Sequence, residues 1–396
     1  MKIVQINSTY GYGSTGKICE GISIFLTKKN IENYTIYSVN GKKDKIGIKN
    51  TNNFYIKIQA LKSKIFGNYG FNSKIATISI INKLEKIKPD IVHIHNIHGH
   101  DCNVEILFKY LKKKNIKIVW TFHDCWAFTG YCPHFDMIKC DKWKKTCNQC
   151  PLRKEYSWIF DRSAINFKRK KKIFSNLNLT IVTPSSWLAN LVKQSFLKDY
   201  PVEVINNGIN LNIFKPIKSN FREKYNIMDK KIVLGVAMPW SKKKGLDSFI
   251  ELSRLLDNRY QIILVGTDNN IDKILPDNII SIHKTHNQEE LAKIYSAADV
   301  FVNPTKEENY PTVNMETIAC GTPVITYKTG GSPEILNTRT GIVTKINNVM
   351  DLKESIINIC DNTKKFDSLK ESINFKEEIK FNEYIELYKR ILKGKL

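Results

Sequence analysis

The sequence contains no apolar run that approaches the roughly 18 residues with which a helix spans a bilayer, so we expect no transmembrane segment. A secretory signal is also absent, because the N-terminus, MKIVQIN, enters an expected strand at once. Both absences predict a cytoplasmic protein. In that reducing compartment the nine cysteines should stay unpaired.

Acidic residues are few relative to basic ones, with 38 Asp and Glu against 62 Lys and Arg, and the net charge is +24. This excess favours nucleic acid, an anionic membrane surface or acidic substrates as partners. Nucleic acid is disfavoured because no recognisable module with stacking aromatic residues is present. The dense basic run at 168–172 is either a solvated helix face or a landing patch for anionic lipid head groups.

With 396 residues the chain is long enough for two domains, each with its own core. Apolar strand patterns alternate with helical patterns along the sequence, which is typical of open, doubly wound α/β sheets. In such sheets ligands bind at the carboxyl ends of the strands. We therefore expect functional residues where a strand pattern gives way to a loop.

The stretch 303–334 contains such a transition from a strand to a loop, with several polar residues in the loop. A buried strand is expected at 298–302, followed by a polar loop, a helix at 310–320 and a further strand. Glu308 falls in the loop and Glu316 in the helix, with seven residues between them. Carboxylates at this edge can accept hydrogen bonds from sugar hydroxyls, while the free amides of the helix N-terminus suit a diphosphate.

This spacing, together with the run Gly330-Gly331-Ser332-Pro333-Glu334, resembles the E-x7-E signature of the family-4 glycosyltransferases. Members of that family transfer a sugar from a nucleotide donor with retention of anomeric configuration. The resemblance implies that Glu308 approaches the donor sugar and that Glu316 grips the nucleotide ribose. The alternative is that both glutamates are solvated charges, and the surrounding strand, turn and glycine pattern favours the site.

Residues 11–17, Gly-Tyr-Gly-Ser-Thr-Gly-Lys, follow a first strand at 3–7 and come within one residue of a phosphate-binding P-loop. Ile18 stands where that loop needs the hydroxyl that holds magnesium, so a nucleoside triphosphatase is excluded. By the resemblance, Gly13 and Gly16 lie near the donor diphosphate and the acceptor. An ordinary tight turn between strand and helix is the alternative.

Four histidines lie within eight residues at the end of a strand expected at 89–95. His93 and His95 share one face of the strand, whereas His98 and His100 follow in the loop. Metal sites usually combine ligands from separate elements, so a metal here is disfavoured. We expect His95 and His98 to line the acceptor side of the site and to form hydrogen bonds with a sugar.

The strand expected at 117–122 ends in His123 and Asp124. The run from there through Trp143 to Pro151 resembles a bacterial branch of family 4 that builds surface polysaccharides. In the family a histidine at this strand end faces the reaction centre. The resemblance therefore implies a catalytic role for His123, with Asp124 as the group that orients it. A strand-end histidine satisfied by backbone groups is the alternative.

The same run holds a cysteine cluster with the spacing C-x7-C-x6-C-x2-C. Its members are Cys132, Cys140, Cys147 and Cys150. Four thiolates can close a tetrahedral structural zinc site, and the C-x2-C pair lets two of them bind one ion. Free thiols packed in an aromatic-rich loop are the alternative. The role is structural in either case, because four cysteines leave no open position on a metal.

In the second half of the chain, the loop 238–245 follows a strand and carries Lys242 and Lys244. The family commonly clamps the donor diphosphate here with an arginine and a lysine. Lys244 fits the lysine position, but Met238 and Pro239 stand near the place of the arginine, and Lys242 is the candidate that compensates. An exposed lysine ahead of a helix is the alternative for Lys244.

A further donor loop is expected at 284–287, after a strand. By the resemblance it contacts the nucleotide base through backbone groups, with Thr285 in the loop. The remaining donor-binding candidates surround the start of the helix that carries Glu316. They are Asn309, Tyr310, Pro311 and Thr312.

The resemblance covers essentially the whole chain and implies an α/β protein of GT-B architecture, with two Rossmann-like doubly wound domains that face each other across a cleft. The expected division is 1–204 for the acceptor-side domain, with a Cys-rich insertion at 125–151, and 205–375 for the nucleotide-sugar-binding domain. Residues 376–396 are expected to form a helix that packs back on the first domain.

The implied function is retaining transfer of a hexose-type sugar from a nucleotide-sugar donor, with UDP as the expected nucleotide, to a glycan acceptor. A lipid-linked oligosaccharide of surface-polysaccharide synthesis is the expected acceptor, which would bring the protein to the inner face of the cell membrane. No D-x-D triplet occurs, which argues against the metal-dependent alternative architecture, so no catalytic metal is expected. Two alternatives stay open: a nucleotide-sugar epimerase of the same architecture and a basic nucleic-acid-binding protein.

Overall fold

The computed structural model describes residues 1–42, 44–362 and 366–395. Within these ranges strands alternate with helices, as the sequence predicted. Leu396, the last residue of the helix expected at the C-terminus, lies outside the described residues, and so do the few positions between the three ranges. Of the helices in the described ranges, none is both long and apolar enough to cross a bilayer.

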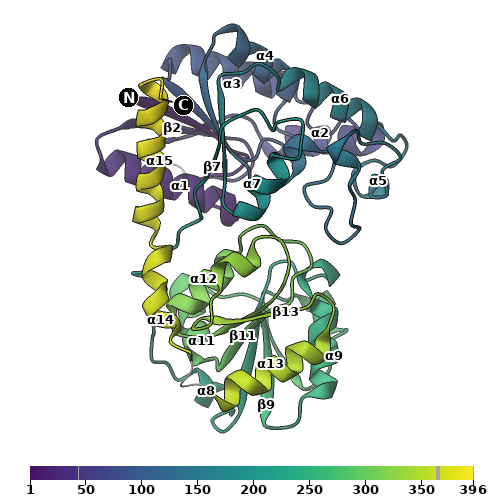
Figure 1. Cartoon of the computed structure of the whole chain (residues 1–396), viewed down its shortest axis with the longest axis vertical. Coiled ribbons are helices and arrows are strands. Elements are labelled where there is room, and N and C mark those ends of the chain that lie inside the picture. The colour runs from purple at the N-terminus through teal and green to yellow at the C-terminus, as the bar shows by residue number, and fades with distance from the viewer. Residues whose placement is uncertain (43, 363–365, 396) are drawn as a thin grey trace. The chain divides into compact units, whose positions relative to one another are not determined.

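Two compact units divide the chain (Figure 1). The first joins Met1–Asn206 to Lys380–Leu396, and the second is Asn207–Ile379. The sequence placed these boundaries after residues 204 and 375. Each unit is built around a parallel sheet of its own, so each has the Rossmann-like, doubly wound α/β form.

The sheet of the first unit has seven parallel strands in the order β3-β2-β1-β4-β5-β6-β7. These are β1 (Lys2–Ile6), β2 (Glu32–Tyr37), β3 (Gly47–Lys49), β4 (Ile91–Ile94), β5 (Lys117–Thr121), β6 (Leu179–Thr183) and β7 (Val202–Val204). The central strands are almost wholly buried because helices cover both faces of the sheet. The strand order reverses between β1 and β4, so the loops after these two strands flank the point where such sheets bind ligands.

The helices of the first unit are α1 (Gly13–Lys28), α2 (Asn53–Phe66), α3 (Lys74–Ile87), α4 (Val104–Lys113), α5 (Arg153–Tyr156), α6 (Ser163–Ile173) and α7 (Ser186–Val192), with the 3-10 turns η1 (Trp126–Phe128) and η2 (Lys142–Lys144). Polar side chains fix where several of them begin. Asn103 accepts a hydrogen bond from the backbone N–H of Ile106, and Ser185 accepts one from that of Leu188. Helix starts are therefore set by local sequence.

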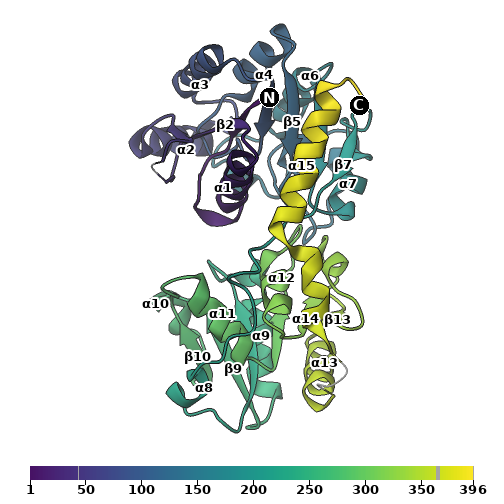
Figure 2. The same cartoon turned by 90° about the vertical axis from the view of Figure 1, so that its left-hand side faces the viewer.

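Helix α15 (Glu377–Leu392) brings the end of the chain onto the first unit (Figure 2). Its buried stripe comprises Phe381, Tyr384, Ile385, Leu387, Tyr388 and Ile391, which pack with apolar residues of α1, β1, β4 and β5. At its C-terminal end, Lys117 Nζ donates to the carbonyl oxygens of Ile391 and Leu392 over 3.1 and 3.2 Å. Such carbonyls have no partner within the helix, so the lysine satisfies them. The returning helix implied by the resemblance is present.

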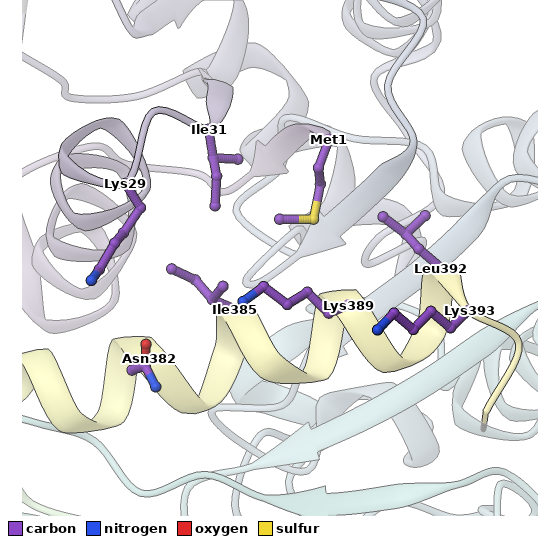
Figure 3. Close-up of a pocket in the computed structure, with 8 residues that line it drawn as sticks. All are labelled: Met1, Lys29, Ile31, Asn382, Ile385, Lys389, Leu392 and Lys393. Atoms are coloured by element: carbon purple, nitrogen blue, oxygen red, sulfur yellow. The ribbon is translucent and has the colours of Figure 1, made fainter.

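A groove of about 460 Å³ lies between α15 and the end of α1 (Figure 3). Met1 and Ile31, which precede β1 and β2, supply part of its apolar lining, and the exposed lysines Lys29 and Lys389 also line it. The groove therefore lies at the amino ends of the strands. The residues that the sequence marks as functional lie at the opposite, carboxyl edge of the sheet.

The sheet of the second unit has six parallel strands in the order β10-β9-β8-β11-β12-β13. These are β8 (Lys231–Val236), β9 (Tyr260–Val265), β10 (Ile279–Ile282), β11 (Val300–Asn303), β12 (Val324–Tyr327) and β13 (Gly341–Thr344). Around them lie α8 (Phe221–Lys224), α9 (Leu246–Leu255), α10 (Asn269–Asp272), α11 (Gln288–Ala297), α12 (Thr312–Ala319), α13 (Val349–Asp361) and α14 (Ser368–Glu371), and the 3-10 turns η3 (Lys242–Lys244), η4 (Ser332–Ile335) and η6 (Ser372–Phe375). The order reverses between β8 and β11, so the loops after these strands flank the ligand-binding point of this sheet.

The buried stripe of α15 predicts a large effect for Leu387→Ala. Leu387 has no exposed surface, so its truncation should leave a cavity and lower the free energy of unfolding by about 2–5 kcal/mol. Denaturant unfolding followed by circular dichroism measures this change. Leu61→Ala is the matched control, because Leu61 on α2 is 50% exposed, and it should change stability by less than about 1 kcal/mol. Equal losses for the two variants would contradict the packing of α15.

Candidate active site

In the second unit, the loops after β8 and β11 are joined along their backbones. Gly245 has a φ of 78°, and a Cβ at this position would lie 2.3 Å from the carbonyl oxygen of Pro304, so only glycine allows this approach. Nearby, the backbone N–H of Lys306 donates to the carbonyl oxygen of Lys243 over 2.8 Å. The lysines of one loop are therefore held beside the carboxylates of the other.

Two ion pairs cross between these loops. Lys244 Nζ lies 2.8 Å from Glu308 Oε2, and Lys243 Nζ lies 3.1 Å from Glu307 Oε2. The second oxygen of Glu308 accepts a hydrogen bond from the backbone N–H of Asn309 over 3.0 Å. The sequence-predicted pair of Lys244 and Glu308 is thus brought together at the carboxyl edge of the sheet, where Lys244 can neutralise a carboxylate or a phosphate.

Helix α12 follows this loop and carries the second predicted glutamate. It begins at Thr312, two residues later than the sequence indicated, with Pro311 as its N-cap residue and no capping side chain. The N–H of Asn314 donates to the carbonyl oxygen of Pro311 over 3.3 Å, whereas the two amides before it have no acceptor within the helix and need partners from outside. Glu316 accepts a hydrogen bond from the Tyr295 hydroxyl over 3.2 Å. Burial and the charge of Glu316 raise the pKa of Tyr295 well above its usual value, so the hydroxyl stays a donor.

The Gly-Gly run after β12 holds the backbone of the Glu308 loop. Gly330 has a φ of 54°, and a Cβ there would lie 1.8 Å from the carbonyl oxygen of Glu308. Gly331 donates its N–H to the carbonyl oxygen of Asn309 over 2.8 Å. Asn207 donates its side-chain amide to the carbonyl oxygen of Tyr310 over 3.2 Å. The predicted donor-binding segment is therefore fixed through its backbone, which leaves its side chains to vary.

Two other predicted donor residues lie at the same edge with fewer contacts. Lys242 is exposed on the η3 turn, directly before Lys243 and Lys244. Thr285 is half-buried in the loop between β10 and α11. Because both follow carboxyl ends of strands, they share the edge with Glu308, although β10 is the outermost strand on its side.

In the first unit, the loop after β1 leads into α1, which begins at Gly13 without a side-chain cap. Gly13 is exposed, and a Cβ there would meet no atom within 4 Å. Gly16 is different: it is buried, and a Cβ would lie 2.6 Å from Thr9 Oγ1. Of the two predicted glycines, Gly13 lies at an accessible helix start, whereas Gly16 allows the loop to pack on the helix.

The histidines after β4 and β5 form a hydrogen-bonded chain inside the first unit. His95 Nδ1 lies 3.1 Å from His123 Nε2, and His95 Nε2 lies 3.0 Å from Gln5 Oε1. His93 shares the strand face of His95, as predicted, and bonds to Tyr388 of α15 over 2.7 Å. The predicted residues His95 and His123 are therefore brought into direct contact.

Burial keeps these rings uncharged. It lowers the pKa of His123 to about 4, where nearby Asp124 works against the shift and His98 adds to it. Burial and the neighbouring His123 likewise lower the pKa of His93 to about 3, and the pKa of His95 falls well below its usual value for the same kind of reason. At neutral pH each ring therefore carries one N–H and one lone pair.

Asp124 binds a different histidine from the one that the sequence suggested. The expectation was that Asp124 orients His123, but Asp124 Oδ2 lies 2.9 Å from His98 Nε2, and Oδ1 accepts from the backbone N–H of Trp126 over 2.9 Å. Burial alone would raise the pKa of Asp124, but His98 and the Trp126 N–H lower it to about 2. Tyr69 completes the group, with its hydroxyl 3.1 Å from His98 Nδ1. Asp124 therefore positions His98, the predicted acceptor-side residue.

Two of these partners carry no motif in the sequence. Gln5 is fully buried and its only sequence signal is a polar residue inside the apolar strand β1. Tyr69 lies between α2 and α3 in a segment marked only by its break in helical periodicity. Residues of this kind become recognisable when the strands are placed side by side.

The basic run at 168–172 does not form a continuous exposed patch. Lys170 is fully buried, donates to the carbonyl oxygens of Trp126 and Thr129 over 2.6 and 3.0 Å, and lies 3.5 Å from the centre of the Trp126 ring. Arg169 pairs with Glu105. The exposed members are Lys168, Lys171 and Lys172. The expected five-residue lipid patch is therefore reduced to three lysines.

The four cysteines of the predicted cluster all line one small cavity, together with the buried ring of Trp143. Burial and the neighbouring thiols raise the pKa of Cys132 to about 12, and burial raises that of Cys147 to about 11. Among the described residues, no three His, Cys, Asp or Glu side chains are arranged as ligands of a metal ion. Zinc binding at these cysteines stays a prediction.

Two Rossmann-like domains, with a lysine–glutamate pair beside a helix start in one and a histidine chain in the other, define a glycosyltransferase of the GT-B type. A family model described as "Glycosyltransferase Family 4" matches residues 54–213, and one described as "Glycosyl transferases group 1" matches residues 217–374. The chain belongs to the family-4 glycosyltransferases, and it is a glycosyltransferase enzyme.

Three known proteins illustrate the likeness. The putative colanic acid biosynthesis glycosyl transferase WcaC of Escherichia coli is 25% identical over 73% of this chain and 70% of its own length. The N,N'-diacetylbacillosaminyl-diphospho-undecaprenol alpha-1,3-N-acetylgalactosaminyltransferase of Campylobacter jejuni is 28% identical over 52% of this chain and 59% of its own. Anabaena HepE, solved in complex with UDP, has 14% identity and a TM-score of 0.69 over 98% of both chains, which shows a shared fold.

The bond between Asp124 and His98 predicts a pH-dependent stability. The pKa of Asp124 in the folded protein, about 2, is below the value of about 3.9 expected in the unfolded chain. Its ionised carboxylate should therefore stabilise the fold by about 2–3 kcal/mol above pH 4, and this contribution should be lost as the pH falls from about 4 to about 2. Urea unfolding of wild type and Asp124→Asn over a pH series measures the difference.

Asp141→Asn is the control for this series, because the side chain of Asp141 is 77% exposed. It should change stability little at any pH. A stability difference between wild type and Asp124→Asn that stays constant from neutral pH to pH 2 would contradict the assignment.

The cysteine cluster predicts about one zinc ion per chain. Because the thiols are protonated at neutral pH, zinc binding should release protons, which calorimetry in buffers of different ionisation enthalpy detects. Chelation should lower the melting temperature, and Cys147→Ser should lower the zinc content measured by elemental analysis. Cys360→Ser, a buried cysteine of the second unit, is the control and should keep the zinc. Metal-free protein with an unchanged melting temperature after zinc is added would contradict the prediction.

Proposed function

We propose that this enzyme moves a hexose-type sugar from a nucleotide-sugar donor to a glycan acceptor in polysaccharide biosynthesis, with the donor on the second unit and the acceptor on the first. The observation that carries the proposal is the 2.8 Å pair of Lys244 and Glu308 beside the uncapped start of α12. A cation and free helix amides suit a diphosphate, and a carboxylate suits sugar hydroxyls. UDP as the nucleotide is supported by the complex of HepE with UDP.

Transfer begins when the bond between the sugar and the diphosphate breaks. The leaving diphosphate gains negative charge, which Lys244, its neighbouring lysines and the amides of α12 stabilise. No step in this scheme requires a catalytic metal. Glu316, already an acceptor for the Tyr295 hydroxyl, supplies a carboxylate for the ribose.

Retention of configuration is proposed to follow from front-face attack, in which an oxygen of the departing phosphate takes the proton of the acceptor hydroxyl. Glu308 is less suited to act as a covalent nucleophile, because its two carboxylate oxygens accept hydrogen bonds from Lys244 and from the N–H of Asn309. Its proposed role is to bind and orient the donor sugar.

A lipid-linked oligosaccharide at the inner face of the cell membrane is the proposed acceptor. The name of the Campylobacter relative, whose acceptor is a diphospho-undecaprenol sugar, supports this proposal. The net charge of +24 and the exposed lysines of α6 would favour an anionic membrane surface. Charge attraction of this kind fades beyond roughly 8 Å at physiological salt.

The two glutamates provide the test. Glu316→Ala should weaken UDP binding by roughly ten- to a hundredfold, because it removes a charged hydrogen-bond acceptor. Glu308→Ala should mainly lower kcat, by roughly a hundredfold or more, because its interactions matter most in the transition state. Calorimetry with UDP gives the first effect, and mass detection of released nucleotide and glycan product from a panel of UDP-sugars gives the second.

Glu251→Ala, at an exposed position of α9, is the control and should leave both quantities unchanged. Wild-type turnover in both Glu308→Ala and Glu316→Ala would contradict the site. A converted nucleotide sugar without a new glycosidic bond would contradict the proposed transfer. The anomeric configuration of the product, read by NMR, decides whether the transfer is retaining.

A further inference from the structure

We infer that Gln5 and His95 are positioning residues that hold His123 in a single tautomer, with the proton on Nε2 and a lone pair on Nδ1. The inference about the tautomer stands on the first unit alone. Its consequence for substrate binding rests on the proposed function. One chain of hydrogen bonds runs from β1 through β4 to the end of β5.

The orientation of the Gln5 amide starts the chain. Gln5 Nε2 lies 3.0 Å from the carbonyl oxygen of Cys19, which can only accept, and 2.7 Å from the hydroxyl of Ser23. The hydroxyl of Thr35 lies 2.9 Å from that of Ser23, so both belong to the same buried group. Reversing the amide would bring its oxygen against the Cys19 carbonyl, so the NH2 group must face α1. Gln5 Oε1 therefore faces His95 as an acceptor.

The Gln5 oxygen determines which ring nitrogen of His95 carries the proton. Its Nε2 lies 3.0 Å from Gln5 Oε1 and must carry the proton, because the amide oxygen cannot donate. The ring is buried, and its pKa is lowered well below the usual value, so it carries only that one proton at neutral pH. His95 Nδ1 is therefore a lone pair, which can only accept.

His95 in turn determines which ring nitrogen of His123 carries the proton. Its Nε2 lies 3.1 Å from His95 Nδ1 and must donate to it. The pKa of His123 is lowered to about 4, first by burial and further by His98, while Asp124 opposes the shift. The ring is therefore neutral at pH 7, and its Nδ1 can only accept a hydrogen bond.

The surroundings keep the rings in place. The indole N–H of Trp120 donates to the backbone carbonyl of His95 over 3.1 Å, and the ring of His93 lies 4.0 Å from that of His95. His93 is itself held between the hydroxyls of Thr121 and Tyr388. The titratable groups close to His123 include Asp124, His98, His95 and His93, and Asp124 is bonded to His98. None of them reverses the tautomer at neutral pH.

The consequence is a restriction on what His123 can bind. A ring that offers only a lone pair accepts from a hydroxyl but repels a carboxylate or a phosphate oxygen. A substrate group that meets Nδ1 of His123 must therefore donate a hydrogen bond, as a sugar hydroxyl does. His123 would bind that hydroxyl as a neutral acceptor and would not act as a general acid at neutral pH.

The tautomer is directly measurable in the full-length protein. Long-range nitrogen–proton NMR of protein labelled with 15N-histidine should show, at pH 7, a pyrrole-type Nε2 and a pyridine-type Nδ1 for His123, assigned with His123→Asn. Gln5→Met removes the acceptor of His95, and His95→Phe removes the acceptor of His123. Either change should turn the His123 signals into those of a mixture of tautomers.

Asn33→Ala is the matched control, because Asn33 is a buried amide on the neighbouring strand β2 that bonds to Thr27 and Ile31 and not to a histidine. It should leave the His123 signals unchanged. Using two variants keeps the test decisive if one of them fails to fold. A pyridine-type Nε2 in the wild type, or an unchanged His123 spectrum in both variants, would overturn the inference.

Activity separates the positioning of His123 from its role in substrate binding. With the UDP-sugar that the wild type uses, kcat/KM should fall roughly two- to tenfold in Gln5→Met, because the lone pair is present for only part of the time. A mixed tautomer with unchanged kcat/KM would overturn the role in substrate binding. The expected tautomer in a wild type that transfers no sugar would support the positioning chain and contradict the proposed function alone.

Discussion

Both units depend on one constraint: a parallel sheet covered by helices on its two faces leaves water only at the ends of its strands. Strand β6 is buried along its whole length, and the central strands of the second unit are as well covered. Chemistry that needs polar groups and solvent must therefore gather where strands end. The reversal of strand order, between β1 and β4 and between β8 and β11, leaves room there for a ligand.

Some polar side chains do lie inside the sheets, and hydrogen bonds compensate for their burial. Gln5, His93 and His95 have almost no exposed surface, and a buried polar group without a partner is strongly destabilising. Each of them instead has partners on both of its polar ends. The buried side-chain nitrogen of Lys170 follows the same rule, with two carbonyl oxygens and an aromatic ring around it. Buried polar groups whose atoms all have hydrogen-bond partners also hold their side chains in one conformation.

Local patterns made part of this site predictable. Glu308 and Glu316 lie in a loop and a helix that follow one strand, and Lys244 lies in a loop that follows another, so strand–loop–helix patterns together with the family resemblance marked them. The partnership of Lys244 with Glu308 spans 64 residues, and only the adjacency of β8 and β11 creates it.

Other parts could not be predicted because sequence neighbours need not be spatial partners. Asp124 follows His123 directly, yet its carboxylate binds His98, 26 residues away, because consecutive side chains at a strand end point in different directions. Lys170 belongs to a basic run, but its position on α6 places it against the carbonyl oxygens of Trp126 and Thr129, while its neighbours Lys168 and Lys171 stay exposed. Gln5 shows its role only when β1 lies beside β4.

The assignment of residues 380–396 to the first unit has a consequence for how the chain is made. A ribosome releases the N-terminus first, so Met1–Asn206 emerges long before the helix that covers Ile3 and Ile22 has been synthesised. Asn207–Ile379, by contrast, is contiguous and holds all of its own strands. Synthesis therefore favours completion of the second unit before the first, which reverses the order in which most chains mature.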